Sequence, residues 1–82
     1  MEISKKDIDR IKEDIPEIIG NNIRHIRENK GLTQTQLAHL LVSDRQYLYK
    51  LEKGKVGLSV VKLLTISRAL EIPVIKLLKG CE

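Results

Sequence analysis

Isoleucine and leucine recur at three- and four-residue spacings along most of the chain, whereas the apolar–polar alternation typical of strands is not sustained anywhere. The first such run, Ile8, Ile11 and Ile15, predicts a short N-terminal helix that Ser4 caps. Pro16 either ends this helix or opens the following one as its first residue. The pattern therefore predicts an all-α protein that begins with an extra short helix.

Five further helices follow from start and stop signals. The first of them runs to about Lys30 and is ended by Gly31, a residue type common just after helix C-termini. Gly20 lies inside this helix, where it weakens the helix slightly or permits close packing. A capping box of Thr33 and Gln36 starts the next helix, which ends near position 41.

The remaining three helices have similar signals. Asp44 caps a helix that ends near Gly54, and Ser59 caps the one after it. Pro73 opens a last short helix that runs through Leu78. The predicted organisation is a helical extension, a five-helix domain and a tail, at residues 1–17, 18–79 and 80–82.

The composition describes one small domain. Its 82 residues suffice for a single core, and the lone Cys81 excludes an internal disulfide. No apolar run approaches the roughly 20 residues that span a bilayer, and the N-terminus is too charged for a secretory signal, so we expect a cytoplasmic protein. His25 and His39 lack partners at metal-ligand spacing, and no catalytic set is apparent. We therefore expect no metal, no cofactor and no enzyme activity.

Positive charge is concentrated away from the N-terminus. Residues 1–17 carry four cations and six anions, whereas residues 18–82 carry eleven cations and five anions, within a net charge of +4. A positive field of this kind suits binding to nucleic-acid phosphates. Charge alone is weak support, because many small basic domains bind nothing acidic.

One predicted helix, at about residues 45–53, carries long polar side chains on one side. Because Leu48 and Leu51 face the core, helical geometry directs four other residues outward. These are Arg45, Gln46, Tyr49 and Lys50. Guanidinium and amide groups form paired hydrogen bonds with guanine and adenine edges in the major groove of DNA. The alternative is a solvated helix face without a ligand.

At these spacings the chain resembles the Cro/phage-repressor (Xre) type of helix-turn-helix DNA-binding domain over roughly residues 19–78. An ordered set of residues carries the resemblance: Gly20, Ile23, Arg27, Thr33, Gln34, Leu37, Ala38, Leu48, Leu51, Glu52, Gly54, Lys55, Ser59, Leu63, Ile66, Ala69, Leu70 and Leu77. The resemblance implies a phage-repressor-like fold whose recognition helix enters the major groove. It also implies base contacts by Arg45, Gln46 and Lys50, with Tyr49 beside them.

Two local features refine this resemblance. Asp44-Arg45-Gln46-Tyr47 is similar to the opening of the recognition helix in controller proteins of restriction–modification systems, which are small stand-alone dimers. The chain departs from the Xre pattern at Val42, where the family usually has Gly in the turn between the two key helices. Because a β-branched residue tolerates left-handed backbone poorly, we expect this turn to take another conformation or the preceding helix to run on.

The resemblance also implies phosphate contacts around the recognition helix. Gln34 opens its helix, where backbone amides and the helix dipole favour an anion. The expected phosphate contacts are Thr33, Gln34, Thr35, Tyr47, Lys53 and Lys55. Several of these residues also fit a place in the protein without DNA: Thr33 as a helix cap, the two lysines as solvated loop residues, and Tyr47 packed against the neighbouring helix.

An ion pair is expected behind the recognition helix. In the resembling family, a cation of the first domain helix pairs with the Glu before the loop, and these residues are Arg27 and Glu52 here. A partly buried pair of this kind is sensitive to removal of one partner. We therefore expect a structural pair whose Arg can also reach a phosphate.

The last two predicted helices hold more apolar residues than the core needs. The residues left outside are Val61, Leu64, Val74, Ile75 and Leu78. An exposed aliphatic patch commonly marks an interface, and the resembling domains pair through their C-terminal helices. The sequence thus predicts a homodimer, or else part of this patch covers the isoleucine stripe of the N-terminal helix.

These features together predict a sequence-specific transcriptional regulator that binds a (pseudo)palindromic operator in double-stranded DNA as a homodimer. Repression by blocking polymerase and activation by touching it remain equally open. The rival interpretation is an antitoxin-type protein-interaction module whose DNA binding is secondary autoregulation. A co-purifying toxin, or a toxin-like reading frame beside its gene, would favour the rival.

Overall fold

The computed structural model describes residues 2–82, and this part of the chain forms four α-helices and one 3-10 helix, without strands. The elements are α1 (Lys5–Asn29), α2 (Gln34–Leu40), α3 (Arg45–Glu52), α4 (Val60–Ala69) and η1 (Val74–Leu78). The all-α prediction is confirmed. The predicted number of helices is wrong, because the first two expected helices are one and the last is a 3-10 helix.

The expected break at Pro16 does not occur, and α1 is continuous over 25 residues. Ser4 caps it as predicted, with the amide of Asp7 donating to Ser4 Oγ at 3.1 Å. A proline removes one backbone donor from a helix interior. Ile15 and Ile19, on either side of Pro16, both pack against the same core, and this packing favours a helix that continues through the proline. Residue 1 of the predicted extension lies outside the described residues.

The last helix, η1, follows Pro73 as predicted but has 3-10 geometry. The amide of Lys76 donates to the Pro73 carbonyl at 3.1 Å, which is the i→i+3 bond of that helix type. Leu77 is its buried residue. One tight turn is enough to place this side chain in the core.

In the described chain, each α-helix ends with a residue of positive φ just after its C-cap. These residues are Gly31, Val42, Gly54 and Glu71. After α2, the amide of Val42 donates to the His39 carbonyl at 3.0 Å and the amide of Ser43 to the Ala38 carbonyl at 2.8 Å, the two bonds of a Schellman motif. Val42 has φ 52°, so the expectation that this turn avoids left-handed backbone is wrong. The exposed Val42 side chain, at 95%, meets no neighbour that would add to the strain.

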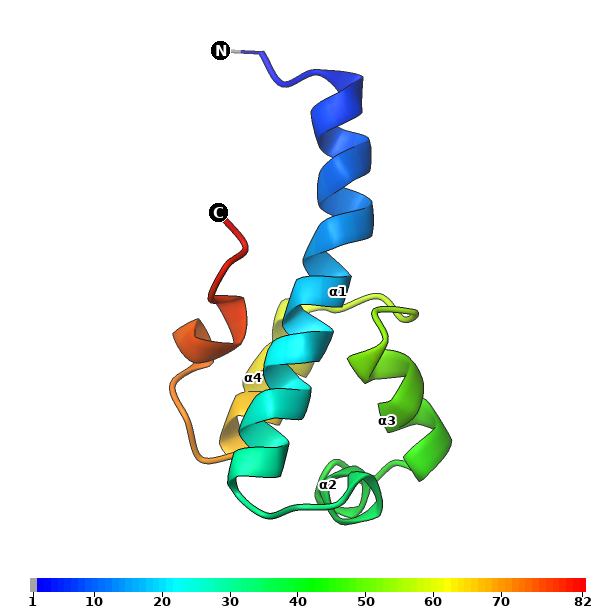
Figure 1. Ribbon diagram of the computed structural model, residues 1–82, viewed down its shortest axis with the longest axis vertical. Coiled ribbons are helices and arrows are strands. Elements are labelled where there is room, and N and C mark those ends of the chain that lie inside the picture. The colour runs from blue at the N-terminus through cyan, green and yellow to red at the C-terminus, as the bar shows by residue number, and fades with distance from the viewer. Residues whose placement is uncertain (1) are drawn as a thin grey trace.

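The core is aliphatic and lies where α1 meets the other helices. Its buried members are Ile19, Ile23, Leu37, Ala38, Leu41, Leu48, Leu51, Ile66, Leu70 and Leu77. In Figure 1, α4 lies behind α1, while α2 and α3 lie on one side of α1 and η1 on the other. Gly20 permits the closest approach, because a Cβ added there would lie 2.5 Å from the Glu52 carbonyl oxygen. The close-packing alternative for Gly20 is therefore the one realised.

The molecule is elongated because α1 is longer than the core it packs against. Its extents are 42 × 24 × 20 Å, and a helix of this length measures about 37 Å. In Figure 1 the N-terminal half of α1 projects beyond the other helices, at the end opposite α2. Within residues 2–82, none of the helices is both long and apolar enough to cross a membrane.

Candidate nucleic-acid interface

Two short helices, α2 and α3, are held by caps that the sequence predicted. In α2 the amide of Gln36 donates to Thr33 Oγ1 at 3.1 Å, and the amide of Thr33 donates to Gln36 Oε1 at 2.8 Å. In α3 the amide of Tyr47 donates to Asp44 Oδ1 at 2.8 Å. Both capping predictions are confirmed. These bonds set where each helix begins and therefore which residues occupy its first turn.

The two sides of α3 differ sharply in exposure. Leu48, Leu51 and Glu52 are buried. The opposite side is exposed and carries the four residues expected at bases: Arg45, Gln46, Tyr49 and Lys50. This outer side presents guanidinium, amide, phenol and ammonium groups. Together they can form hydrogen bonds with both the donors and the acceptors on base edges.

Behind α3, Arg27 of α1 forms a buried pair with Glu52. Arg27 Nε lies 2.6 Å from Glu52 Oε2, and Nη2 lies 3.1 Å from Oε1. Arg27 Nη1 also donates to the Leu32 carbonyl at 2.8 Å. The hydrogen bond with Glu52 raises the pKa of Arg27 above its ordinary value, against the opposing effect of burial. The two-pronged geometry fixes the C-terminal end of α3 against α1.

The pair extends to the exposed side of α3 through Gln34. Gln34 Nε2 donates to Glu52 Oε1 at 3.1 Å, and Arg45 Nη1 donates to Gln34 Oε1 at 3.3 Å. The contacts therefore run from Arg27 of α1 to the C-terminal end of α3, then through Gln34, the first residue of α2, to the N-terminal end of α3. They place Arg45 beside Gln34 at the edge of the outer side of α3.

Helix α1 also contributes to this surface, which the sequence pattern did not lead us to predict. A hollow beside Gln34 and Arg45 is lined also by Asn21 and Arg24 of α1 and by Lys53, which follows α3. Arg24 is exposed. Its position three residues before Arg27 places it on the same side of α1, and this spacing is the signal that could have found it.

The other residues expected at phosphates lie in different surroundings. Gln34 is half-buried, whereas Thr33, Thr35, Lys53 and Lys55 are each exposed at the surface of the described chain. Tyr47 instead packs against the core, and Lys62 Nζ lies 5.0 Å from the centre of its ring. Packing, one of the two alternatives for Tyr47, is thus the observed one.

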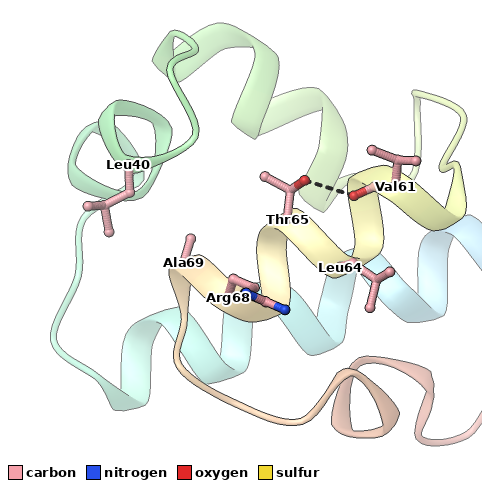
Figure 2. Close-up of a pocket in the computed structure, with 6 residues that line it drawn as sticks. All are labelled: Leu40, Val61, Leu64, Thr65, Arg68 and Ala69. Atoms are coloured by element: carbon pink, nitrogen blue, oxygen red, sulfur yellow. Dashed lines mark hydrogen bonds between the residues drawn. The ribbon is translucent and has the colours of Figure 1, made fainter.

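A second exposed surface lies on α4 and η1. Val61, Leu64, Ile75 and Leu78 are exposed, whereas Val74 is half-buried against the core. Figure 2 shows the part of this surface where Val61 and Leu64 line a hollow that extends to Leu40 of α2. Polar Thr65 and Arg68 line it as well, with Thr65 Oγ1 donating to the Val61 carbonyl at 2.8 Å. The surface is therefore mainly apolar, with two polar side chains among its aliphatic ones.

Residues 2–82 contain no group of three or more side chains that could together hold a metal ion. His25, on α1, and His39, on α2, are both exposed. Cys81 is partly buried, and this burial raises the pKa of its thiol, with a smaller effect of Glu82 in the same direction. At neutral pH this thiol is therefore protonated and a weak nucleophile.

Comparison with known proteins connects this geometry to a family. A model of helix-turn-helix proteins, HTH_3, matches residues 23–77. The control protein C.SmaI of Serratia marcescens is 34% identical over 65 residues, which are 79% of this chain and 77% of that protein. The uncharacterized HTH-type transcriptional regulator y4dJ of Sinorhizobium fredii is 31% identical over 64 residues, which are 78% of this chain and 83% of that protein.

Solved structures of similar fold include regulators. The restriction-modification controller protein C.AhdI from Aeromonas hydrophila shares 36% identity with a TM-score of 0.70, over 74% of this chain and 92% of that one. The clp gene regulator ClgR from Corynebacterium glutamicum shares 30% identity with a TM-score of 0.77, over 82% and 87% of the two chains. These relatives are regulators or control proteins. With α2 and α3 arranged as described, the chain belongs to the Xre-type (Cro/phage-repressor) helix-turn-helix family of DNA-binding transcriptional regulators.

Proposed function

We propose that this protein regulates transcription by binding a pseudopalindromic operator as a homodimer, with α3 in the major groove. The observation that carries the proposal is the asymmetry of α3. Its inner side is buried and tied to α1 through Glu52 and Arg27, while its outer side leaves Arg45, Gln46 and Lys50 exposed. A helix fixed in this way presents base-reading groups at little cost in ordering.

Phosphate contacts around α3 would set its register on the duplex. Gln34 is well placed for a phosphate contact. Its side-chain nitrogen carries two hydrogens, and Glu52 accepts a bond from one of them, so the other can be donated to a phosphate oxygen. Thr33 and Thr35 lie beside it in the sequence, and Lys53 and Lys55 follow α3 in the loop.

We also assign a phosphate contact to Arg24, which lines the hollow at Gln34 and Arg45. Its guanidinium would add a cation from α1 to those of the loop after α3. Tyr47 can reach a phosphate only with its hydroxyl, because its ring packs against the core.

Dimerisation through α4 and η1 would give the protein two recognition helices. The exposed apolar residues Val61, Leu64, Ile75 and Leu78 are the contacts of this interface, with Val74 at its inner edge. A two-fold dimer reads two half-sites that are separated by about one turn of DNA. This arrangement accounts for an apolar surface that the monomer leaves uncovered.

Among regulators of this family, we propose that the protein acts as a controller of a restriction–modification system. C.AhdI is described as such a controller and is 36% identical over 74% of this chain. The control protein C.SmaI is 34% identical over 65 residues. Reading frames for a nuclease and a methyltransferase beside its gene would support this proposal, and a toxin-like reading frame would favour the antitoxin interpretation instead.

Fluorescence anisotropy with the DNA upstream of its own gene tests the regulator proposal. We expect the native protein to prefer this DNA over a random duplex, and Arg45→Ala and Gln46→Ala each to reduce that preference by about tenfold. Lys55→Gln is the matched control, because loss of a phosphate contact weakens binding to both duplexes alike.

Equal affinity of the native protein for both duplexes would refute sequence-specific regulation and favour the protein-interaction interpretation. Retention of the full preference in Arg45→Ala and Gln46→Ala would show that another surface reads the bases.

A further inference from the structure

The N-terminal half of α1 is a bare helix with apolar residues. Every residue from Lys5 to Asp14 is exposed, including Ile8 at 38% and Ile11 at 49%. The exposed patch of α4 and η1 therefore does not cover these isoleucines within the same chain. In Figure 1 this half of α1 extends past all other helices. A helical segment as short as residues 5–14 is only marginally stable in water when nothing packs against it. Burial of its apolar side against another helix would stabilise it.

The isoleucines follow the spacing of a coiled-coil seam. Ile8, Ile11, Ile15 and Ile18 are separated by three, four and three residues, which are the a, d, a and d positions of two heptads. Ile15 and Ile18 are half-buried, and the first two are exposed. The seam thus starts at the surface of the domain and continues out along the projecting helix.

The charges beside the seam select the orientation of a partner helix. In this register Lys5 and Lys12 occupy e positions, while Asp7 and Asp14 occupy g positions. In a parallel pair, g faces the e position five residues later in the other helix. Asp7 then faces Lys12 of the second copy, and the two-fold axis repeats this pair. In an antiparallel pair, e faces e and g faces g, so like charges would meet.

We propose that the first half of α1 pairs in parallel with the same segment of a second copy, forming a short two-stranded coil. The inference rests on the proposed homodimer and adds a second interface to it. The base of the seam adjoins the C-terminal segment, because a Cβ added at Gly80 would lie 3.7 Å from Ile18 Cγ2. Leu78 and Ile75 of the exposed patch belong to that segment. The two interfaces can therefore form one continuous surface.

Parallel pairing also suits the placement of the DNA-binding elements. It puts both domains at the same end of the coil, and α2 lies at the end of the molecule opposite the N-terminus of α1 (Figure 1). The coil would therefore point away from DNA and leave both copies of α3 free. Its surplus of acidic residues, six against four cations over residues 1–17, would lie far from the phosphates.

Sedimentation equilibrium without DNA tests the seam. We expect Ile8→Ser with Ile11→Ser to raise the dimer dissociation constant by at least about tenfold. Ile3→Ser is the matched control, because Ile3 is also exposed but precedes the helix, and it should leave the constant unchanged. A dissociation constant unaffected by the double change, or a native mass of three chains, would overturn the proposal.

Charge reversal tests the orientation. Asp7→Lys and Lys12→Asp should each weaken the dimer several-fold, and the two together in one chain should restore it, because the facing pairs are again of opposite sign. Single changes that strengthen the dimer would indicate antiparallel pairing and refute the parallel arrangement.

Disulfide trapping gives an independent readout. In a Cys81→Ser background, Ile11→Cys should form a disulfide-linked dimer under mild oxidation, because equivalent d positions face each other only in a parallel pair. Arg10→Cys, which points away from the seam, is the control and should remain monomeric on a denaturing gel. Equal cross-linking of the two variants would contradict the seam.

These outcomes separate this inference from the proposed function. If dimerisation depends on Leu64 and Ile75 but not on Ile8 and Ile11, the pairing of α1 is wrong and the homodimer stands. If the native protein is monomeric at all concentrations and on operator DNA, the homodimer and the pairing of α1 are both wrong. If the seam variants weaken the dimer but the native protein does not discriminate between duplexes, the pairing stands and the regulator proposal fails.

Discussion

Val42 adopts a backbone conformation that its residue type disfavours. Its φ of 52° lies in the left-handed region, where a residue with a Cβ is disfavoured by about 1–2 kcal/mol. Gly31 occupies the equivalent position after α1 with φ 73°. Both helix ends require a residue with positive φ. Glycine adopts this conformation without strain and valine does not.

Val42→Gly should therefore stabilise the protein by about 1 kcal/mol, because relief of left-handed strain exceeds the added flexibility of glycine in the unfolded chain. Urea denaturation followed by circular dichroism measures the change. Gly31→Val is the converse control and should destabilise through backbone strain alone, since a Cβ there would meet no neighbour within 4 Å. An unchanged urea midpoint in Val42→Gly would contradict this prediction.

At the scale of elements, the position of α3 depends on two contacts with α1. Gly20 lets the backbone of α3 approach closely, since any Cβ there would lie 2.5 Å from the Glu52 carbonyl oxygen. Arg27 binds the Glu52 side chain in the same region. Together they hold one end of the recognition helix by backbone and side chain at once.

Arg27→Met should lower the free energy of unfolding by about 3 kcal/mol, because it leaves a buried carboxylate without its cation. The double variant Arg27→Met with Glu52→Leu should recover part of the loss, since it removes the unpaired charge as well. Equilibrium denaturation of Arg27→Met, of Glu52→Leu and of the double variant measures the three losses. A double variant whose loss equals the two single losses added together would show that the pair is not the source of the effect.

At the scale of the whole molecule, charge is separated along the long axis. The acidic first half of α1 projects at the end opposite α2 in Figure 1, and the net charge of +4 arises from the rest of the chain. Screening confines electrostatic effects to about 10 Å at 0.1 M salt. The N-terminal charges should therefore have little influence on a DNA surface near α2 and α3.

The salt dependence of DNA binding should reflect this separation. Lys53→Gln with Lys55→Gln should reduce the slope of log affinity against log salt by about two per protomer, because two phosphate contacts are lost. Asp9→Asn with Glu13→Gln, on the outer side of the projecting helix, should leave the slope unchanged. Anisotropy titrations across salt concentrations compare the two, and equal effects would refute the placement of DNA at the α2–α3 end.

Helix starts were predictable from sequence because capping is local. Ser4, Thr33, Asp44 and Ser59 each accept the predicted bond from an amide three residues later. The continuity of α1 through Pro16 was not predictable in this way. It depends on packing of both sides of Pro16 against residues far along the chain.

The amino-acid sequence by itself determined the all-helical class, the starts of the helices and which side of α3 is buried, because capping bonds and helical periodicity act within a few residues. Tertiary structure alone decided that Val42 turns left-handed, that Gln34 bridges Glu52 and Arg45, and that Arg24 lies beside them. The contacts of Gln34 and Arg24 join segments that are distant in the chain. Their geometry is set by how α1, α2 and α3 pack, and helix periodicity carries no information about that.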